Sequence, residues 1–129
     1  MKLLLDTHVV LWWLADDPRL SDAAVRAIAN GSNDVLVSAA SVWEVEIKRA
    51  KGTLEAPGDV VEQIEAAGFD LLSITGLHAR EAGRLPGHHN DPFDRMLVAQ
   101  AVVEDATLVS GDTVIPGYGV PVLAADRRD

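Results

Sequence analysis

The sequence predicts an α/β sandwich in which helices cover both faces of a short parallel sheet. Short apolar runs of strand length alternate along the chain with longer segments whose apolar residues recur at helical spacing. Strands that alternate with helices are typical of a parallel sheet covered on both faces. The chain has 129 residues, 48% of them hydrophobic, and contains no repeat and no long linker. We therefore expect residues 1–129 to form a single domain.

Five short apolar segments are predicted to be the strands. The first follows Lys2 and consists of three leucines that stop at Asp6, as a strand buried on both faces of a parallel sheet does. The others are similarly short apolar runs that alternate with the helical segments. The predicted strands span residues 2–5, 35–37, 69–74, 107–109 and 120–123.

Six segments with helical spacing are predicted to be the helices. Thr7 is expected to cap the first of them, which ends before Pro18. The second opens at Ser21 and closes near Gly31, a typical helix stop. The other four begin near Ser38, Asp59, Thr75 and Pro92 and end near Gly52, Ala67, Arg84 and Glu104. Residues 85–90 are predicted to be a loop because they contain Pro, Gly and Asn.

The composition excludes several classes of protein. The chain has no cysteine, which rules out disulfides, thiolate metal sites and a cysteine nucleophile and suits a cytoplasmic protein. The apolar stretch that runs to about Ala15 is interrupted by Asp6 and His8 and is shorter than the ~20 residues of a membrane-spanning helix. No small-residue cleavage site follows it, so we expect a soluble protein without a signal peptide or membrane contact.

The formal net charge of −9 limits how the protein can meet nucleic acid. Contacts to phosphate rely on Lys and Arg, so this charge argues against a protein that coats nucleic acid non-specifically. It leaves room for a nuclease whose metal ions screen the acids locally. Acidic side chains that converge on one site need a cation there.

Four acids are placed where a parallel sheet forms its ligand sites. Asp6 and Asp112 directly follow predicted strands, whereas Glu44 and Asp94 lie in the first turn or two of predicted helices. The ends of parallel strands and the starts of the helices that follow them lie at the same edge of the sheet. We therefore expect these four acids, which come from distant parts of the chain, to converge at that edge.

Each of these acids also has a purely structural interpretation. Asp94 would favour the helix dipole in any case, and Glu44 is spaced to form a surface ion pair with Lys48. Asp6 and Asp112 could be ordinary turn residues. Taken together the acids favour a site, because a partly buried carboxylate after three leucines needs a metal ion or a cationic partner.

An oxygen-only set of ligands selects hard cations, Mg²⁺ or Mn²⁺, over zinc. Such ions bind through carboxylates and substrate phosphate while keeping several water molecules. The chemistry expected from this pocket is hydrolysis of a phosphodiester by a metal-activated water. No side-chain nucleophile is required.

Three neighbours of these acids complete the predicted site. Asp91 competes with Asp94 for one position, but Asp91 precedes Pro92 as a helix N-cap does, so we favour Asp94. The hydroxyls of Thr7 and Ser110 lie beside two of the acids in the sequence. They could hold a carboxylate or a water molecule, or serve only as cap and turn residues.

Basic and aromatic residues near the predicted pocket are candidates for contact with RNA. Lys48 and Arg95 are the favoured candidates for contact with phosphate. His89 lies in the Pro- and Gly-containing loop, where we prefer RNA contact or loop anchoring to catalysis. The three tryptophans lie on apolar helix faces, which favours core or interface packing over base stacking. They are Trp12, Trp13 and Trp43.

The chain resembles the PIN-domain ribonucleases, in particular the VapC-type toxins of toxin–antitoxin modules. Three stretches carry the resemblance, in order and over nearly the whole chain. They are Leu3-Leu4-Leu5-Asp6-Thr7-His8, Ser41-Val42-Trp43-Glu44-Val45-Glu46-Ile47-Lys48 and His89-Asn90-Asp91-Pro92-Phe93-Asp94-Arg95. The fourth acid of the family normally follows a later strand in a Thr/Ser-x-Asp setting, which Ser110-Gly111-Asp112 occupies here.

The resemblance implies a PIN-like three-layer α/β/α sandwich with a short central parallel sheet. It implies an acidic site made of Asp6, Glu44, Asp94 and Asp112, with Asp112 the most variable position in the family. It also implies Mg²⁺- or Mn²⁺-dependent endoribonuclease activity, frequent homodimers, and a small antitoxin partner that covers the active-site region.

Two other functions compete with a metal-dependent ribonuclease toxin. One is a non-catalytic PIN-like module that grips a partner protein through its Trp-bearing helices, against which the four acids argue. The other is a metal-dependent phosphatase. The stretch Asp6-Thr7-His8 lacks the second aspartate of the aspartyl-phosphate pattern, so this interpretation ranks last.

Overall fold

The computed structural model describes residues 1–87, 90–112 and 115–126. Within this part of the chain a five-stranded sheet has the order β3-β2-β1-β4-β5, and neighbouring strands run parallel throughout. The strands are β1 (Lys2–Leu5), β2 (Asp34–Ser38), β3 (Asp70–Leu72), β4 (Thr107–Ser110) and β5 (Val122–Ala124). The predicted parallel α/β sheet is confirmed.

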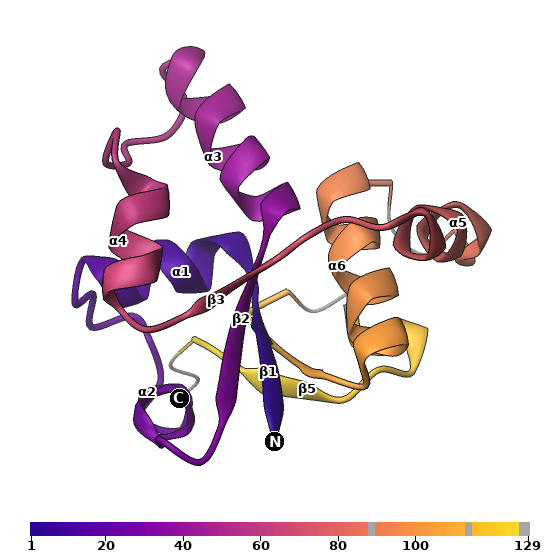
Figure 1. Ribbon diagram of the computed structural model, residues 1–129, viewed down its shortest axis with the longest axis horizontal. Helices are drawn as coiled ribbons and strands as arrows, with labels where there is room; N and C mark the ends of the chain where they lie inside the picture. Colours follow the sequence, from indigo (N-terminus) through magenta and orange to yellow (C-terminus); the bar gives the residue numbers. More distant parts are fainter. Residues whose placement is uncertain (88–89, 113–114, 127–129) are drawn as a thin grey trace.

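Helices cover both faces of this sheet. Figure 1 shows α1 to α4 on one side and α5 with α6 on the other, which makes the three layers of an α/β/α sandwich. The helices are α1 (Thr7–Leu14), α2 (Asp22–Ala29), α3 (Ala39–Ala50), α4 (Val60–Ala66), α5 (Gly76–Arg84) and α6 (Pro92–Glu104), with a short 3₁₀ helix η1 (Ile115–Tyr118). In the described residues, no helix is long and apolar enough to cross a membrane.

The central strand β1 divides the core into two parts. Leu3 and Leu5 pack with Val9 and other residues on the α1 side, whereas Leu4 packs with Leu97 of α6 on the opposite side. All three leucines of β1 are fully buried. Side chains alternate across a strand, so a strand covered on both faces needs apolar residues at successive positions. The chain leaves this core at Asp6.

The topology places a crevice at the end of β1. From β1 the chain moves outward through β2 to β3, and later returns to form β4 and β5 on the other side of β1. Ligands of open parallel sheets bind at such a switch point, outside the carboxyl ends of the strands. The backbone N–H of Asp6 donates to the carbonyl of Val109, 3.0 Å away, which fixes the ends of β1 and β4 beside each other.

Two details of the prediction were wrong. Thr7 is not the cap of α1 but its first residue, and the N-cap is Asp6. The predicted strand over residues 69–74 is only three residues long, because the chain beyond Leu72 turns toward α5, where Thr75 forms a capping box with His78. The capping chemistry therefore ends this edge strand earlier than its apolar composition indicates.

Candidate active site

A cavity of about 630 Å³ is lined by all four acids that the sequence singled out. Asp6 and Asp112 follow β1 and β4, Glu44 lies in the second turn of α3, and Asp94 lies in the first turn of α6. Four segments far apart in the chain thus contribute carboxylates to one hollow. The structure brings these side chains together as the topology argument predicted; their chemical roles stay a prediction.

Asp6 lines the cavity and is 8% exposed. The hydroxyl of Ser110 donates to Asp6 Oδ2 at 2.7 Å, and the same hydroxyl oxygen accepts from the backbone N–H of Asp112 at 3.0 Å. Burial raises the pKa of Asp6 above its ordinary value, although the bond from Ser110 opposes this rise. A nearby cation would relieve the cost of holding this carboxylate in its charged form.

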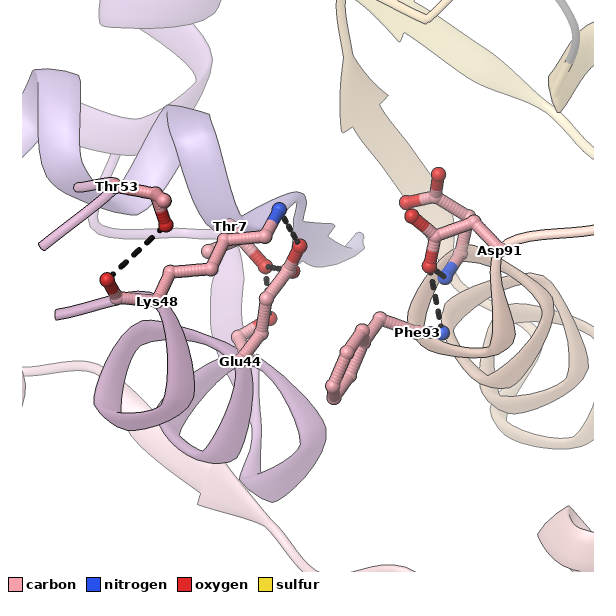
Figure 2. A network of polar contacts seen from close by, with 8 residues as sticks. Thr7, Glu44, Lys48, Thr53, Asp91 and Phe93 are labelled. Carbon is pink, nitrogen blue, oxygen red and sulfur yellow. Dashed lines mark hydrogen bonds and ion pairs between the residues drawn. The ribbon is translucent and has the colours of Figure 1, made fainter. Parts of the chain in front are cut away.

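Glu44 is held at both of its carboxylate oxygens. The hydroxyl of Thr7 donates to Oε1 at 2.6 Å, and the Lys48 ammonium donates to Oε2 at 2.6 Å (Figure 2). The hydroxyl of Ser41 lies 3.0 Å from that of Thr7. The ion pair between Glu44 and Lys48 therefore exists, but it is not the surface pair of the structural interpretation, because Glu44 is only 6% exposed.

The first turn of α6 separates the roles of two acids. Asp91 is the N-cap, and its carboxylate accepts from the backbone N–H groups of Phe93 at 2.8 Å and Asp94 at 3.3 Å. This confirms the predicted cap, with Pro92 at the first helical position. Asp94 is half-buried and lines the cavity, as Asp91 also does. In Figure 2, Asp91 lies across from the Glu44 side chain.

One wall of the cavity was not predicted as part of the site. It is formed by His8 and Trp12, which lie one turn apart on α1, and by Asp17 and Arg19 in the segment that follows. Arg19 forms a two-pronged ion pair with Asp17 and lies 5.2 Å from the centre of a Trp12 ring. The spacing of His8 and Trp12 could have indicated a shared helix face, whereas the position of Arg19 depends on the turn that follows.

Asp126 is a second residue that sequence reasoning missed. It lines the cavity and is positioned by an antiparallel bridge to Leu20. Its carboxyl carbon would lie 3.4 Å from a β-carbon at Gly111, so a side chain at position 111 would crowd it. No local pattern marks Asp126, because its place depends on pairing between segments about 100 residues apart.

One predicted RNA contact, Arg95, has other partners in the structure. Arg95 is absent from the cavity lining, and its guanidinium donates to the carbonyls of Ala82, Leu85 and Pro86 at 2.8 to 2.9 Å. Arg95 therefore ties α6 to the end of α5, which argues against the expected contact with phosphate. His89 lies outside the described residues.

The tryptophans have three different surroundings. Trp13 packs against Phe69, and Trp12 lines the cavity. Trp43 is 62% exposed and meets Phe93 edge-on, with ring centres 5.3 Å apart. Trp43 is therefore not a core residue, and interface packing stays a prediction for it.

The carboxylates suit a hard cation chemically but are not gathered into a ready-made set of ligands. Among the described residues, no group of three or more acidic or histidine side chains is close enough to hold an ion. Both oxygens of Glu44 already accept hydrogen bonds, one from Thr7 and one from Lys48. Oxygen ligands and the buried charge of Asp6 fit Mg²⁺ or Mn²⁺, provided that the acids approach one another.

The sequence model of the PIN domain family matches residues 3–120. The chain is 33% identical over 122 residues to ribonuclease VapC22 of Mycobacterium tuberculosis, covering 92% of this chain and 93% of that protein. A similar fold occurs in VapBC2 from Rickettsia felis bound to a DNA fragment from its promoter, with a TM-score of 0.74 and 14% identity over 98% of this chain and 100% of that chain. Another occurs in DNA-bound VapBC from Salmonella typhimurium, with a TM-score of 0.71 and 17% identity over 96% of this chain and 98% of that chain. With a family match over most of its length and a relative of this similarity, the chain belongs to the PIN domain family.

Proposed function

We propose that the protein is a divalent-metal-dependent endoribonuclease of the VapC type, the toxin of a toxin–antitoxin pair. The observation that carries this proposal is the single cavity lined by Asp6, Glu44, Asp94 and Asp112 at the carboxyl edge of the sheet. The similarity to a VapC ribonuclease supports it.

Asp6, Glu44 and Asp94 would hold the ion, and Asp112 would lie beside them. Bound Mg²⁺ or Mn²⁺ supplies an activated water and stabilises the charge of the phosphate. The protein holds the carboxylates in position. Ser110 fixes one oxygen of Asp6 and the backbone of Asp112, while Thr7 fixes one oxygen of Glu44.

RNA would reach these acids along the α1 wall of the cavity, which is the wall formed by His8, Trp12, Asp17 and Arg19. In the described part of the chain, the lysine and arginine side chains that line the cavity are Lys48 and Arg19. His8 and Trp12 add flat rings to the same wall, and rings of this kind stack on bases of any sequence. This arrangement suits a single-stranded segment of RNA better than a rigid duplex.

The proposal includes a cognate antitoxin that covers the active-site region, a homodimer, and action on RNA in the cytoplasm. VapBC assemblies with a similar fold support the antitoxin partner. The described lining of the cavity contains eight carboxylates, which would attract a basic segment of such a partner.

Purified protein tests the catalytic proposal directly. Wild type should cleave RNA with Mn²⁺ or Mg²⁺ and stop when EDTA is added, and Asp94→Asn should be inactive but folded. In cells, expression alone should arrest growth, and co-expression with the adjacent small open reading frame should relieve the arrest. Failure of metal-loaded wild type to cleave any RNA would favour the non-catalytic binding module.

A further inference from the structure

One lysine reaches into the acidic part of the cavity. Lys48 Nζ lies 2.6 Å from Glu44 Oε2, and the charges of Asp91 and Asp94 also act on the ammonium group. The hydrogen bond to Glu44, and to a smaller extent the charges of Asp91 and Asp94, raise the pKa of Lys48. The other basic side chain of the described lining, Arg19, is directed to Asp17 instead.

The two members of this ion pair differ in how easily they can move. The Glu44 side chain is 8% exposed and is fixed at its other oxygen by Thr7. The Lys48 side chain is 40% exposed and has a flexible four-carbon stem. Lys48 can therefore withdraw toward solvent without disturbing the core, whereas Glu44 cannot follow it.

We propose that Lys48 is a built-in counterion that occupies the Glu44 oxygen needed by the metal ion, so that the ion binds only as the lysine withdraws. This inference rests on the proposed function, since it concerns the same acids. The observation behind it is the 2.6 Å contact between the Lys48 ammonium and Glu44 Oε2 on the cavity wall. Once displaced, the ammonium group lies at the rim of the cavity, where it can contact phosphate.

Competition of this kind has two opposite consequences. Without metal, Lys48 offsets the buried charge of Glu44 and stabilises the fold. With metal, the same contact must be broken, which weakens binding of the ion. Loss of Lys48 should therefore destabilise the metal-free protein and tighten metal binding, a combination that a merely structural lysine would not produce.

The test compares Lys48→Met with Lys51→Met. Lys51 is exposed at the end of the same helix and is absent from the cavity lining, so this control removes an equal charge without touching Glu44. Binding of Mn²⁺ is measured by titration calorimetry, and thermal unfolding is measured in EDTA. We expect Lys48→Met to bind Mn²⁺ roughly tenfold more tightly than wild type, within the range typical of coupled sites. It should unfold at lower temperature in EDTA, while Lys51→Met should resemble wild type in both measurements.

Equal or weaker Mn²⁺ binding by Lys48→Met, or no binding by either protein, would overturn the inference. If Lys48→Met does not fold, Lys48→Gln decides the matter, because its amide can still donate to Glu44 but carries no charge; it should also bind Mn²⁺ more tightly. Calorimetry does not depend on RNA cleavage. If wild type binds Mn²⁺ but cleaves no RNA, the proposed function is wrong, whereas the effect of Lys48 on Mn²⁺ binding can still be measured.

Discussion

Among the described residues, two polar clusters can be compared, one at the carboxyl edge of the sheet and one between α5 and α6. The first is the acid cluster, made of Asp6, Glu44, Asp94 and Asp112 with the side chains that hold them. The second is the α5–α6 cluster, made of His78, Gln100 and Glu104. In the α5–α6 cluster, His78 Nδ1 accepts from the backbone N–H of Thr75 at 3.1 Å, so Nε2 carries the proton and donates to Glu104 at 2.9 Å. His78 is 1% exposed and Gln100 is fully buried.

The two clusters differ in how many carboxylates they gather. In the α5–α6 cluster one carboxylate, that of Glu104, accepts a hydrogen bond from the His78 ring. The cavity around the acid cluster is lined by eight carboxylates, with one lysine and one arginine in the described lining. Burial of polar groups is common in stable proteins, so it does not by itself indicate a functional site. A concentration of carboxylates around an open cavity is a stronger indication, because it creates a negative potential that favours the binding of a cation.

The largest expected effect is on the rate of RNA cleavage, which should depend on Asp94 of the acid cluster but not on an acid at the other end of α6. Asp94→Asn should lower RNA cleavage by about a thousandfold or more, because it removes a charged ligand that acts on the metal and the transition state. Asp105 provides the control, since it is exposed at the other end of α6 in the left-handed conformation that Asn tolerates. Asp105→Asn should cleave at the wild-type rate. Equal cleavage by the two variants would show that the acid cluster has no special role in cleavage.

The α5–α6 cluster should affect stability but not activity. His78→Ala deletes a buried ring, its bond to Glu104 and half of the capping box at Thr75. We expect a loss of about 2–4 kcal/mol in the free energy of unfolding, measured by urea denaturation. The folded fraction should cleave RNA at an unchanged rate. A selective loss of cleavage in folded protein would show that this cluster also serves the active site.

The pH dependence of stability sharpens the same contrast. The folded-state pKa of Asp6 is raised, mainly by burial, so the folded protein holds this proton more tightly than the unfolded chain. In EDTA, wild type should therefore lose stability as pH rises from the ordinary pKa of 3.8 through the raised folded value. Asp6→Asn should lack this loss and be more stable at neutral pH by roughly 1 kcal/mol, above the usual effect of surface changes. Urea denaturation across this pH range measures the difference, and a wild type no more sensitive to pH than the variant would contradict it.

Much of this molecule could be predicted from local patterns, and the exceptions share a physical reason. Three leucines before Asp6 indicate a strand buried on both faces, and Asp91 before Pro92 indicates a helix start; both agree with the structure. The meeting of the four acids followed from the rule for parallel sheets. The contacts of Arg95 could not be predicted, because its partners are carbonyls at the end of another helix. Asp126 likewise depends on contacts between the two ends of the chain.

The smallest expected effect concerns the α1 wall, which carries the cation that sequence reasoning missed. Asp94→Asn is expected to bind RNA without cutting it. In that background, Arg19→Gln should weaken binding of a short single-stranded RNA by a few-fold. The slope of log affinity against log salt should fall by about 0.7, the contribution of one phosphate contact to a single strand. Fluorescence anisotropy at several salt concentrations measures both quantities. Arg26→Gln is the control, because Arg26 is exposed on α2 and is absent from this cavity. If both variants change the slope equally, Arg19 acts only through the overall charge of the protein, and RNA does not follow the α1 wall.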